Sequence, residues 1–302
     1  MKKDNITLIA EPEKDYELLD SGDGEKLERY GRIVLSRHDP QAIWPKADAK
    51  QWHKADAIYG DENKALLATE KKEKGRWIEK TEIPSAWPIL FGGLVFHIRL
   101  SAFKHTGIFP EHKSSWAWIN DAICREQRQI SILNLFGYTG GATLTALKAG
   151  AKVTHLDGSR VAINWGKENA KSSGLSDKPV RWIIDDAVSF VQREIRRGNK
   201  YDGIIMDPPS YGRGPNGEKW QIEDDLLKLL LLCKEILSDN PSFILLNGYA
   251  AGYSALSYAN ILSEVFPFMK EDIEYGEIGI RETARNIILP AGIFARWNKP
   301  IQ

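Results

Sequence analysis

Three aspartates follow three successive runs of branched and aromatic residues, each at the point where its run ends. They are Asp157, Asp186 and Asp207, and the runs are 152–156, 180–184 and 201–206. Runs of this composition predict buried strands, and ligands bind at the carboxyl ends of strands in open parallel sheets. One acid at such a place can be a helix cap. Three aspartates, each at the end of a predicted strand, favour a shared ligand site, because carboxylates accept hydrogen bonds from hydroxyl and amino groups.

A glycine-rich turn, 134–141, lies between a strand-like run at 129–133 and a helix-like run at 142–150. Glycine lets a backbone pass close to a ligand where a side chain would collide. The turn reads NLFGYTGG, without the glycine spacing of a dinucleotide site or a phosphate loop. An acid after the second strand suits ribose hydroxyls, and one after the third suits the amine of adenine. These features predict S-adenosylmethionine, which has ribose and adenine but no phosphate.

The stretch Asp207-Pro208-Pro209-Ser210-Tyr211 has the residue types for methyl transfer to nitrogen. A carboxylate and a proline carbonyl accept hydrogen bonds from an amine, and stacking of an aromatic ring on a base contributes about 1–3 kcal/mol. An exocyclic amine and a ring nitrogen of guanine both stay open as targets. Methylation of cytosine C5 is disfavoured, because it needs a thiolate that first attacks the ring. Neither cysteine, Cys124 or Cys233, directly follows the strand-like run at 201–206 or the next one at 242–247.

From about residue 113 onward, strand-like and helix-like runs alternate and predict a doubly wound α/β sheet with right-handed crossovers. Two final strand-like runs, 272–280 and 286–296, predict an antiparallel hairpin at one edge. The stretch 212–217 is rich in glycine and proline and predicts a mobile loop. Helices are expected at 114–125, 142–150, 159–172, 187–197, 222–237 and 254–265.

The first 112 residues predict a small, mostly β accessory domain, and 113–302 the catalytic domain. The elements expected in the accessory domain are strands at 16–20 and 31–36, a helix at 47–59, a solvated charged tip at 69–75 and a hairpin around Gly92-Gly93. A two-residue glycine turn is typical of hairpins. The stretch 104–113, KHTGIFPEHK, carries two histidines at the boundary between the domains. Ligand clefts often form at such boundaries.

The bulk composition is that of a globular protein with balanced charge. The chain has 302 residues, 42% of them hydrophobic, and 41 basic against 41 acidic side chains. Composition alone therefore does not demand a nucleic-acid partner. Two cysteines are too few for a disulfide scaffold or a cysteine-rich zinc site. Without a visible signal peptide or an apolar run of about 20 residues, we expect a cytoplasmic protein with no membrane contact and no metal. An edge hairpin is compatible with a monomer and with an oligomer.

Four stretches together resemble class I S-adenosylmethionine-dependent methyltransferases: 134–141, 157–159, 185–186 and 207–211. More narrowly, they resemble the bacterial 23S ribosomal RNA methyltransferases that modify cytosine C5 or guanine N7. Residues 106–112 are similar to the motif that precedes the catalytic domain in that group. This chain has Glu111-His112-Lys113 where that motif usually ends in an Asp-Gln-Arg-like triplet. The resemblance implies a Rossmann-like sheet of seven strands with a reversed last strand.

The expected site combines these motifs. Residues expected to be catalytic are Asp207, Pro208, Pro209 and Tyr211. Residues expected to hold S-adenosylmethionine are Phe109, Asn134, Phe136, Gly137, Tyr138, Thr139, Gly140, Asp157, Ser159, Asp185, Asp186 and Asp207. Substrate contacts are expected from His112, Ser210, Arg213 and Asn247, with Lys219 and Trp220 as further candidates for holding a base.

The predicted function is methylation of a base nitrogen in RNA, most naturally ribosomal RNA. An RNA base has to be unstacked and turned into the pocket for such chemistry. Two alternatives stay open. One is a methyltransferase for a protein or a small molecule, which the balanced net charge permits. The other is a nucleoside-binding module without catalysis.

Overall fold

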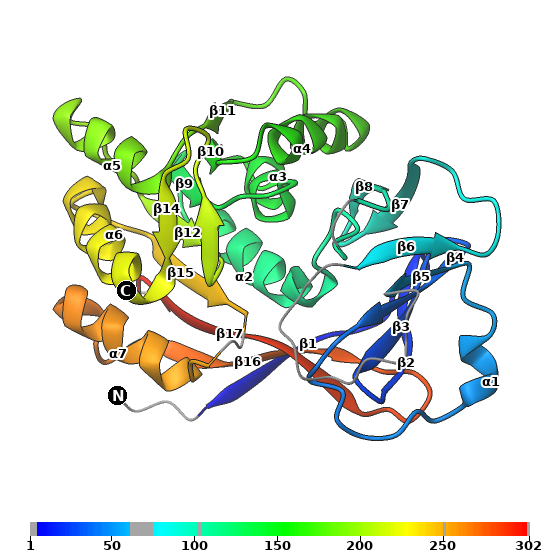
Figure 1. Ribbon diagram of the computed structural model, residues 1–302. Helices are drawn as coiled ribbons and strands as arrows, with labels where there is room; N and C mark the ends of the chain where they lie inside the picture. The colour runs from blue at the N-terminus through cyan, green and yellow to red at the C-terminus, as the bar shows by residue number, and fades with distance from the viewer. Residues whose placement is uncertain (1–4, 61–74, 102–103, 250–251, 301–302) are drawn as a thin grey trace. The chain divides into compact units, whose positions relative to one another are not determined.

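A sheet of eight strands dominates the second half of the computed structural model, which describes residues 5–60, 75–101, 104–249 and 252–300 (Figure 1). The strand order is β1-β16-β17-β15-β12-β9-β10-β11. Strands β9 to β12 and β15 pair in parallel, and β17 pairs antiparallel with β15. The predicted doubly wound sheet with a reversed last strand is confirmed. The bounds are β1 (Ile6–Ala10), β9 (Ser131–Leu135), β10 (Lys152–Asp157), β11 (Val180–Ile184), β12 (Gly203–Met206), β15 (Phe243–Gly248), β16 (Glu274–Arg281) and β17 (Ile288–Asn298).

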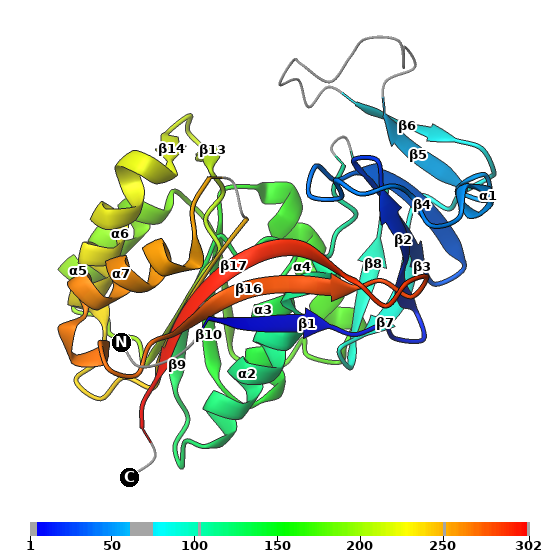
Figure 2. The ribbon, with the colours of Figure 1, turned by 90° about the horizontal axis from the view of Figure 1, so that it is seen from below.

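The eighth strand, β1, was not expected from the sequence. It lies beside β16 at the edge of the sheet (Figure 2). A Cβ atom added to Gly276 would lie 1.7 Å from the carbonyl oxygen of Ile6. A side chain at position 276 would therefore prevent the backbone of β1 from approaching, and this glycine is the sequence signal for the extra strand.

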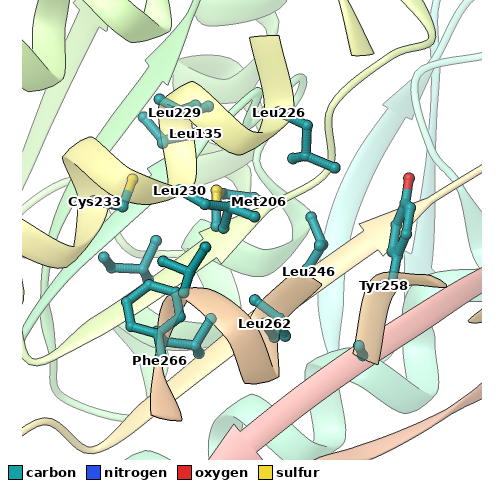
Figure 3. Packing of buried hydrophobic residues seen from close by; sticks show 14 of the residues in the cluster. Leu135, Met206, Leu226, Leu229, Leu230, Cys233, Leu246, Tyr258, Leu262 and Phe266 are labelled. Atoms are coloured by element: carbon teal, nitrogen blue, oxygen red, sulfur yellow. The ribbon is translucent and has the colours of Figure 1, made fainter. Parts of the chain in front are cut away.

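Helices cover both faces of the sheet, with α2, α3 and α4 on one side and α5, α6 and α7 on the other (Figures 1 and 2). Their bounds are α2 (Lys113–Cys124), α3 (Gly141–Lys148), α4 (Arg160–Ser172), α5 (Ala187–Arg196), α6 (Ile222–Ile236) and α7 (Ala255–Val265). All six begin within about two residues of the predicted positions. The core on the α6–α7 side contains Met206, Leu230, Leu246 and Phe266 (Figure 3).

The chain forms two compact units, each built from separate segments. The large unit comprises Met1–Leu8, His112–Ile278 and Ala291–Gln302, and the small unit comprises Ile9–Glu111 and Gly279–Pro290. The predicted division into an accessory domain 1–112 and a catalytic domain 113–302 remains a prediction about independent domains. The large unit therefore includes residues 1–8, from the beginning of the chain, and the small unit includes residues 279–290, from near its other end.

The small unit is mostly β, with a five-stranded sheet of order β2-β3-β4-β5-β6 and a separate hairpin β7-β8. Its elements are β2 (Tyr16–Gly22), β3 (Glu25–Tyr30), β4 (Ile33–His38), α1 (Ala49–Trp52), β5 (Ala57–Gly60), β6 (Arg76–Glu79), β7 (Trp87–Phe91), β8 (Leu94–Ile98) and η1 (Pro110–His112), whose last residue begins the large unit. The Gly92-Gly93 hairpin is confirmed, and both glycines have positive φ.

One predicted element is wrong and a second is right only in part. The charged tip predicted at 69–75 lies outside the described residues apart from Gly75. The expected helix at 47–59 is limited to one turn, α1, because residues 57–60 pair as β5 with β4 and β6. Residues 214–217 of the expected loop at 212–217 do form an irregular connection, between β13 (Tyr211–Arg213) and β14 (Lys219–Gln221), whereas residues 212–213 pair within this hairpin. At 57–60 the residues themselves favour a strand, because Ile58 and Tyr59 suit a pleated sheet and Gly60 disfavours a helix.

Candidate functional site

The turn between β9 and α3 is fastened to the end of the neighbouring strand β10. The N–H of Gly137 donates to the carbonyl of Leu156 at 2.9 Å, and the N–H of Tyr138 donates to Oδ2 of Asp157 at 2.9 Å. Phe136 and Tyr138 have φ values of 57° and 49°. Left-handed backbone is costly for residues with side chains, and strain of this kind clusters at ligand sites. The turn therefore presents a fixed arc of backbone beside Asp157.

The glycines of this turn are required by contacts with protein side chains. A Cβ atom at Gly137 would lie 2.5 Å from the ring of His155, and one at Gly141 would lie 2.2 Å from the ring of Trp116. The sequence interpretation, in which these glycines make room for a ligand, therefore gave the wrong reason at both positions. Gly140 is different, because its φ of 94° lies in the region that favours glycine.

Buried, hydrogen-bonded polar side chains pack against the glycine turn and support it. The amide of Asn134 donates to Oγ1 of Thr143 at 2.9 Å, and that hydroxyl lies 2.8 Å from Nδ1 of His155. Burial lowers the pKa of His155 to about 3, so the ring is neutral at physiological pH. Thr139 is also buried, and its carbonyl accepts from the amide of Asn169 at 3.1 Å. Asn134 and Thr139 thus hold the turn in place from within.

Asp157 is an acceptor held by backbone groups. Its Oδ1 accepts from the N–H of Ser159 at 2.8 Å, and its Oδ2 accepts from Tyr138. Burial raises the pKa of Asp157, and the two N–H groups act in the opposite direction. A carboxylate presented in this way fits the paired hydroxyls of a ribose. Ser159 has a second task, because its hydroxyl accepts from the N–H of Ala162 and caps α4.

The two acids after β11 have separate partners. Asp186 caps α5, and its Oδ1 accepts from the N–H of Ser189 at 2.8 Å. Asp185 forms an ion pair with Arg193, a residue that sequence reasoning missed. The spacing of eight residues from the acid to a basic side chain on the next helix was the available signal. Because Asp185 is already paired, the oxygens of Asp186 are the better candidates for an adenine amine.

Asp207 follows β12 and contacts a histidine from the start of α2. Nε2 of His112 lies 3.1 Å from Oδ2 of Asp207. Asn247 lies beside Asp207, because Met206 pairs with Leu246 and both residues follow directly. Asn247 is buried, and its Oδ1 has no hydrogen-bond partner among the described residues. Three of the predicted substrate and catalytic residues therefore meet at one sheet edge.

The β13–β14 hairpin joins the Asp207 stretch to the glycine turn. The indole N–H of Trp220 donates to the carbonyl of Pro209 at 2.7 Å, and its ring lies 4.8 Å from that of Phe136. Trp220 is buried, so its predicted role in holding a base is wrong. Tyr211 is 54% exposed and remains available for stacking. The carbonyl of Ser210 accepts from the N–H of Ile222 and closes the hairpin.

The tip of the same hairpin lies over the turn that carries Asp157. A Cβ atom at Gly158 would lie 3.3 Å from the carbonyl oxygen of Arg213 and 3.6 Å from Cα of Gly214. The backbone of the hairpin tip therefore passes close to the β10–α4 turn. Both Arg213 and Lys219 are exposed.

Phe109 belongs to the small unit, where its ring lies edge-on to that of His105 at 5.2 Å. Its expected contact with the cofactor remains a prediction. Among the described residues, no cluster of three or more His, Cys, Asp or Glu side chains is placed to hold a metal ion. No helix in the described ranges has the length and apolarity that crossing a bilayer requires.

Comparisons with known proteins agree with this geometry. The family described as S-adenosylmethionine-dependent methyltransferase matches residues 66–252, which is more than half of the chain. A solved methyltransferase from Agrobacterium tumefaciens is 37% identical, with a TM-score of 0.89 over 99% of this chain and 97% of that one. A methyltransferase solved in complex with S-adenosylhomocysteine is 18% identical, with a TM-score of 0.69 over 94% of this chain and 76% of that one, which shows the fold alone.

A curated relative, ribosomal RNA large subunit methyltransferase K/L of Shewanella frigidimarina, is 31% identical over 174 residues. The match covers 56% of this chain and 24% of the relative, so this chain spans about a quarter of its length. The acceptor set around Asp157 and Asp186 fits the adenosine that the family cofactor carries. The chain belongs to the S-adenosylmethionine-dependent methyltransferase family.

Proposed function

We propose that this protein methylates a base nitrogen in ribosomal RNA. The observation that carries the proposal is the pairing of Asp207 with His112 at the carboxyl end of β12, one strand away from the glycine turn. The Shewanella relatives named ribosomal RNA large subunit methyltransferase K/L support the choice of RNA. Such a substrate also suits the cytoplasmic location expected from the sequence.

The chain's task in this reaction is alignment. S-adenosylmethionine supplies an electrophilic sulfonium methyl group, so the protein mainly has to orient the nucleophile and exclude water. The carboxylate of Asp207 and the carbonyl of Pro208 accept hydrogen bonds from an amine and direct its lone pair. His112 fixes the orientation of that carboxylate through the 3.1 Å contact. Tyr211, exposed beside them, offers its ring to the face of the base.

The cysteines support nitrogen rather than cytosine C5 as the target. Cys233 is buried in α6, and burial raises its pKa to about 12, so it is a thiol at physiological pH. Cys124 ends α2, and the chain then enters β9 at its amino end, opposite the edge that carries Asp207. Neither thiol can act as the covalent nucleophile that C5 methylation requires.

The direct test supplies labelled S-adenosylmethionine together with large-subunit RNA, small-subunit RNA or cell protein. We expect label in large-subunit RNA, and mass spectrometry of its nucleosides then identifies the modified base. Asp207→Ala should lower turnover by about 100-fold or more, as loss of a positioned hydrogen-bonding group does, while the cofactor Kd changes by less than about threefold. The exposed Asp239→Ala serves as the control.

The outcomes separate the alternatives. Label in protein alone would favour the protein methyltransferase, and binding of S-adenosylmethionine without transfer to any of these would favour a module without catalysis. Full turnover in Asp207→Ala would contradict the role given to the stretch 207–211.

A further inference from the structure

Tyr258 is a buried tyrosine whose hydroxyl has no hydrogen-bond partner among the described residues. Its side chain is 2% exposed. Three other buried tyrosines use their hydroxyls: Tyr16 and Tyr30 donate to Glu28, and Tyr201 donates to Glu194 at 2.6 Å. An unpaired buried hydroxyl is costly, so its retention in a well-packed core calls for an explanation.

The hydroxyl lies at the carboxyl edge of the sheet. A Cβ atom at Gly248 would lie 2.2 Å from the Tyr258 oxygen, so the hydroxyl rests directly against the last residue of β15. Figure 3 shows the ring with its oxygen pointing away from Leu262 of the same helix and from Phe266, which follows that helix. Glycine at 248 therefore lets the hydroxyl reach this edge.

Asp207 and Tyr258 approach this edge from opposite faces. Ile244 and Leu246 belong to the core under α6 and α7, so alternation along β15 directs Gly248 to that face and Asn247 to the other. Asp207 follows Met206, also a core residue on the α6–α7 side, and so shares the face of Asn247. The pKa of Tyr258 is raised, first by burial and then by the charge of Asp207, so the hydroxyl keeps its proton.

We propose that the Tyr258 hydroxyl donates a hydrogen bond to the substrate base, on an acceptor atom beside the nitrogen that Asp207 engages. This rests on the proposed function. The unpartnered Oδ1 of Asn247 adds an acceptor on the Asp207 side. A base edge with an amino donor next to a ring or carbonyl acceptor matches this arrangement, and a base edge that lacks the acceptor leaves the hydroxyl unpaired. Tyr258 thereby becomes a specificity-determining residue for the proposed reaction.

The test compares two matched substitutions, Tyr258→Phe and Tyr201→Phe, with large-subunit RNA as the substrate. Tyr258→Phe should lower kcat/KM by about 10-fold to 100-fold, leave the cofactor Kd within about twofold, and leave the thermal midpoint unchanged or higher, because no internal hydrogen bond is lost. Tyr201→Phe removes a hydroxyl that is bonded to Glu194. It should lower the thermal midpoint and keep kcat/KM.

The inference is overturned if Tyr258→Phe keeps kcat/KM within about twofold of the wild type, or if its thermal midpoint falls as that of Tyr201→Phe does. Such a result with active wild-type protein leaves the proposed function standing. No transfer to RNA by the wild type, in the presence of bound S-adenosylmethionine, overturns both.

Discussion

At the scale of single residues, the acids at the strand ends differ in what already binds them. Asp185 is paired with Arg193, and Asp186 caps α5. Asp157 is held by the N–H groups of Tyr138 and Ser159, and the interactions that set its pKa include no cation. A partly buried carboxylate whose pKa is raised is a candidate functional group. Asp157 is therefore the acid whose remaining hydrogen-bonding capacity best serves a ribose.

Asp157→Asn tests that assignment. The amide can accept only through its single oxygen, and it carries no charge, so the hydrogen bonds to the ribose hydroxyls weaken. A hydrogen bond to a charged group contributes about 1.5–3 kcal/mol, and the cofactor Kd should therefore rise by about 10-fold to 100-fold. Calorimetric titration measures this change. Asp177→Asn, at an exposed turn position, is the control, and an unchanged Kd in Asp157→Asn would remove this residue from the site.

The pH dependence of cofactor binding follows from the same residue. The folded-state pKa of Asp157 lies above its ordinary value because of burial. As the pH falls through that raised pKa, the carboxyl takes up a proton and loses acceptor capacity, so affinity should decline at a pH above the usual aspartate range. Affinity should be full at neutral pH. Titrations between about pH 4 and pH 8 should show this decline in the wild type and not in Asp157→Asn.

At the scale of elements, the β13–β14 hairpin links the two halves of the site. The hairpin begins at Tyr211, the last residue of the stretch 207–211. Its Trp220 packs against Phe136 of the glycine turn, and its tip lies close to Gly158. A movement of this hairpin would therefore shift three groups together: the Pro209 carbonyl, the ring of Phe136 and the backbone beside Gly158. Preorganised positions of this kind govern alignment of a nucleophile.

Trp220→Phe isolates the hydrogen bond within that link. The ring that packs on Phe136 is largely kept, while the donor to the Pro209 carbonyl at 2.7 Å is lost. We expect a loss of about 1 kcal/mol in the free energy of unfolding and a fall in kcat of several fold, with little change in cofactor Kd. Trp44→Phe, whose indole donates to the carbonyl of Ser21, is the control that should change stability alone. Equal kcat values in the two variants would show that the Trp220 bond does not position the site.

The sequence was sufficient for elements whose signal is local. Periodicity and caps located α4, α5 and α7, because Ser159, Asp186 and Ser254 are good N-caps. Prediction from the sequence failed where the structure depends on contacts with residues far away in the sequence. β5 pairs with β4 and β6, which are distant in the sequence, so the expected helix at 47–59 stops short of it. Tyr258 was missed, and Trp220 was assigned to the substrate, because nothing local in the sequence marks a hydroxyl that lies against Gly248 or an indole that donates to Pro209.

At the scale of the whole molecule, the small unit is completed by the loop between β16 and β17. Arg285, from that loop, donates to Oδ1 of Asp20 at 3.0 Å and to Oε1 of Glu282 at 2.7 Å. Both carboxylates are fully buried. Asp20 also accepts from the indole of Trp52 at 2.8 Å, which fastens α1. One arginine near the carboxyl end thus neutralises two acids of the small unit.

Arg285→Ala should be strongly destabilising, because it leaves buried carboxylates without their cation. Breaking a buried pair in this way costs about 3–5 kcal/mol. The matched control is Arg281→Ala on the same hairpin, since Arg281 pairs with Glu11, whose side chain is 54% exposed. An exposed pair contributes at most about 1 kcal/mol. Urea unfolding measures both, and similar losses for the two variants would contradict the role given to Arg285.

The return of residues 279–290 to the small unit has a consequence for the protein during its synthesis. The first segment of that unit ends at Glu111, and its second segment is translated roughly 180 residues later. At bacterial-type elongation rates, that interval is about 10–40 s. Asp20 leaves the ribosome long before Arg285 does, so the nascent small unit carries an uncompensated acid throughout this time. We expect the small unit to acquire protease resistance only after residue 290 has left the ribosome.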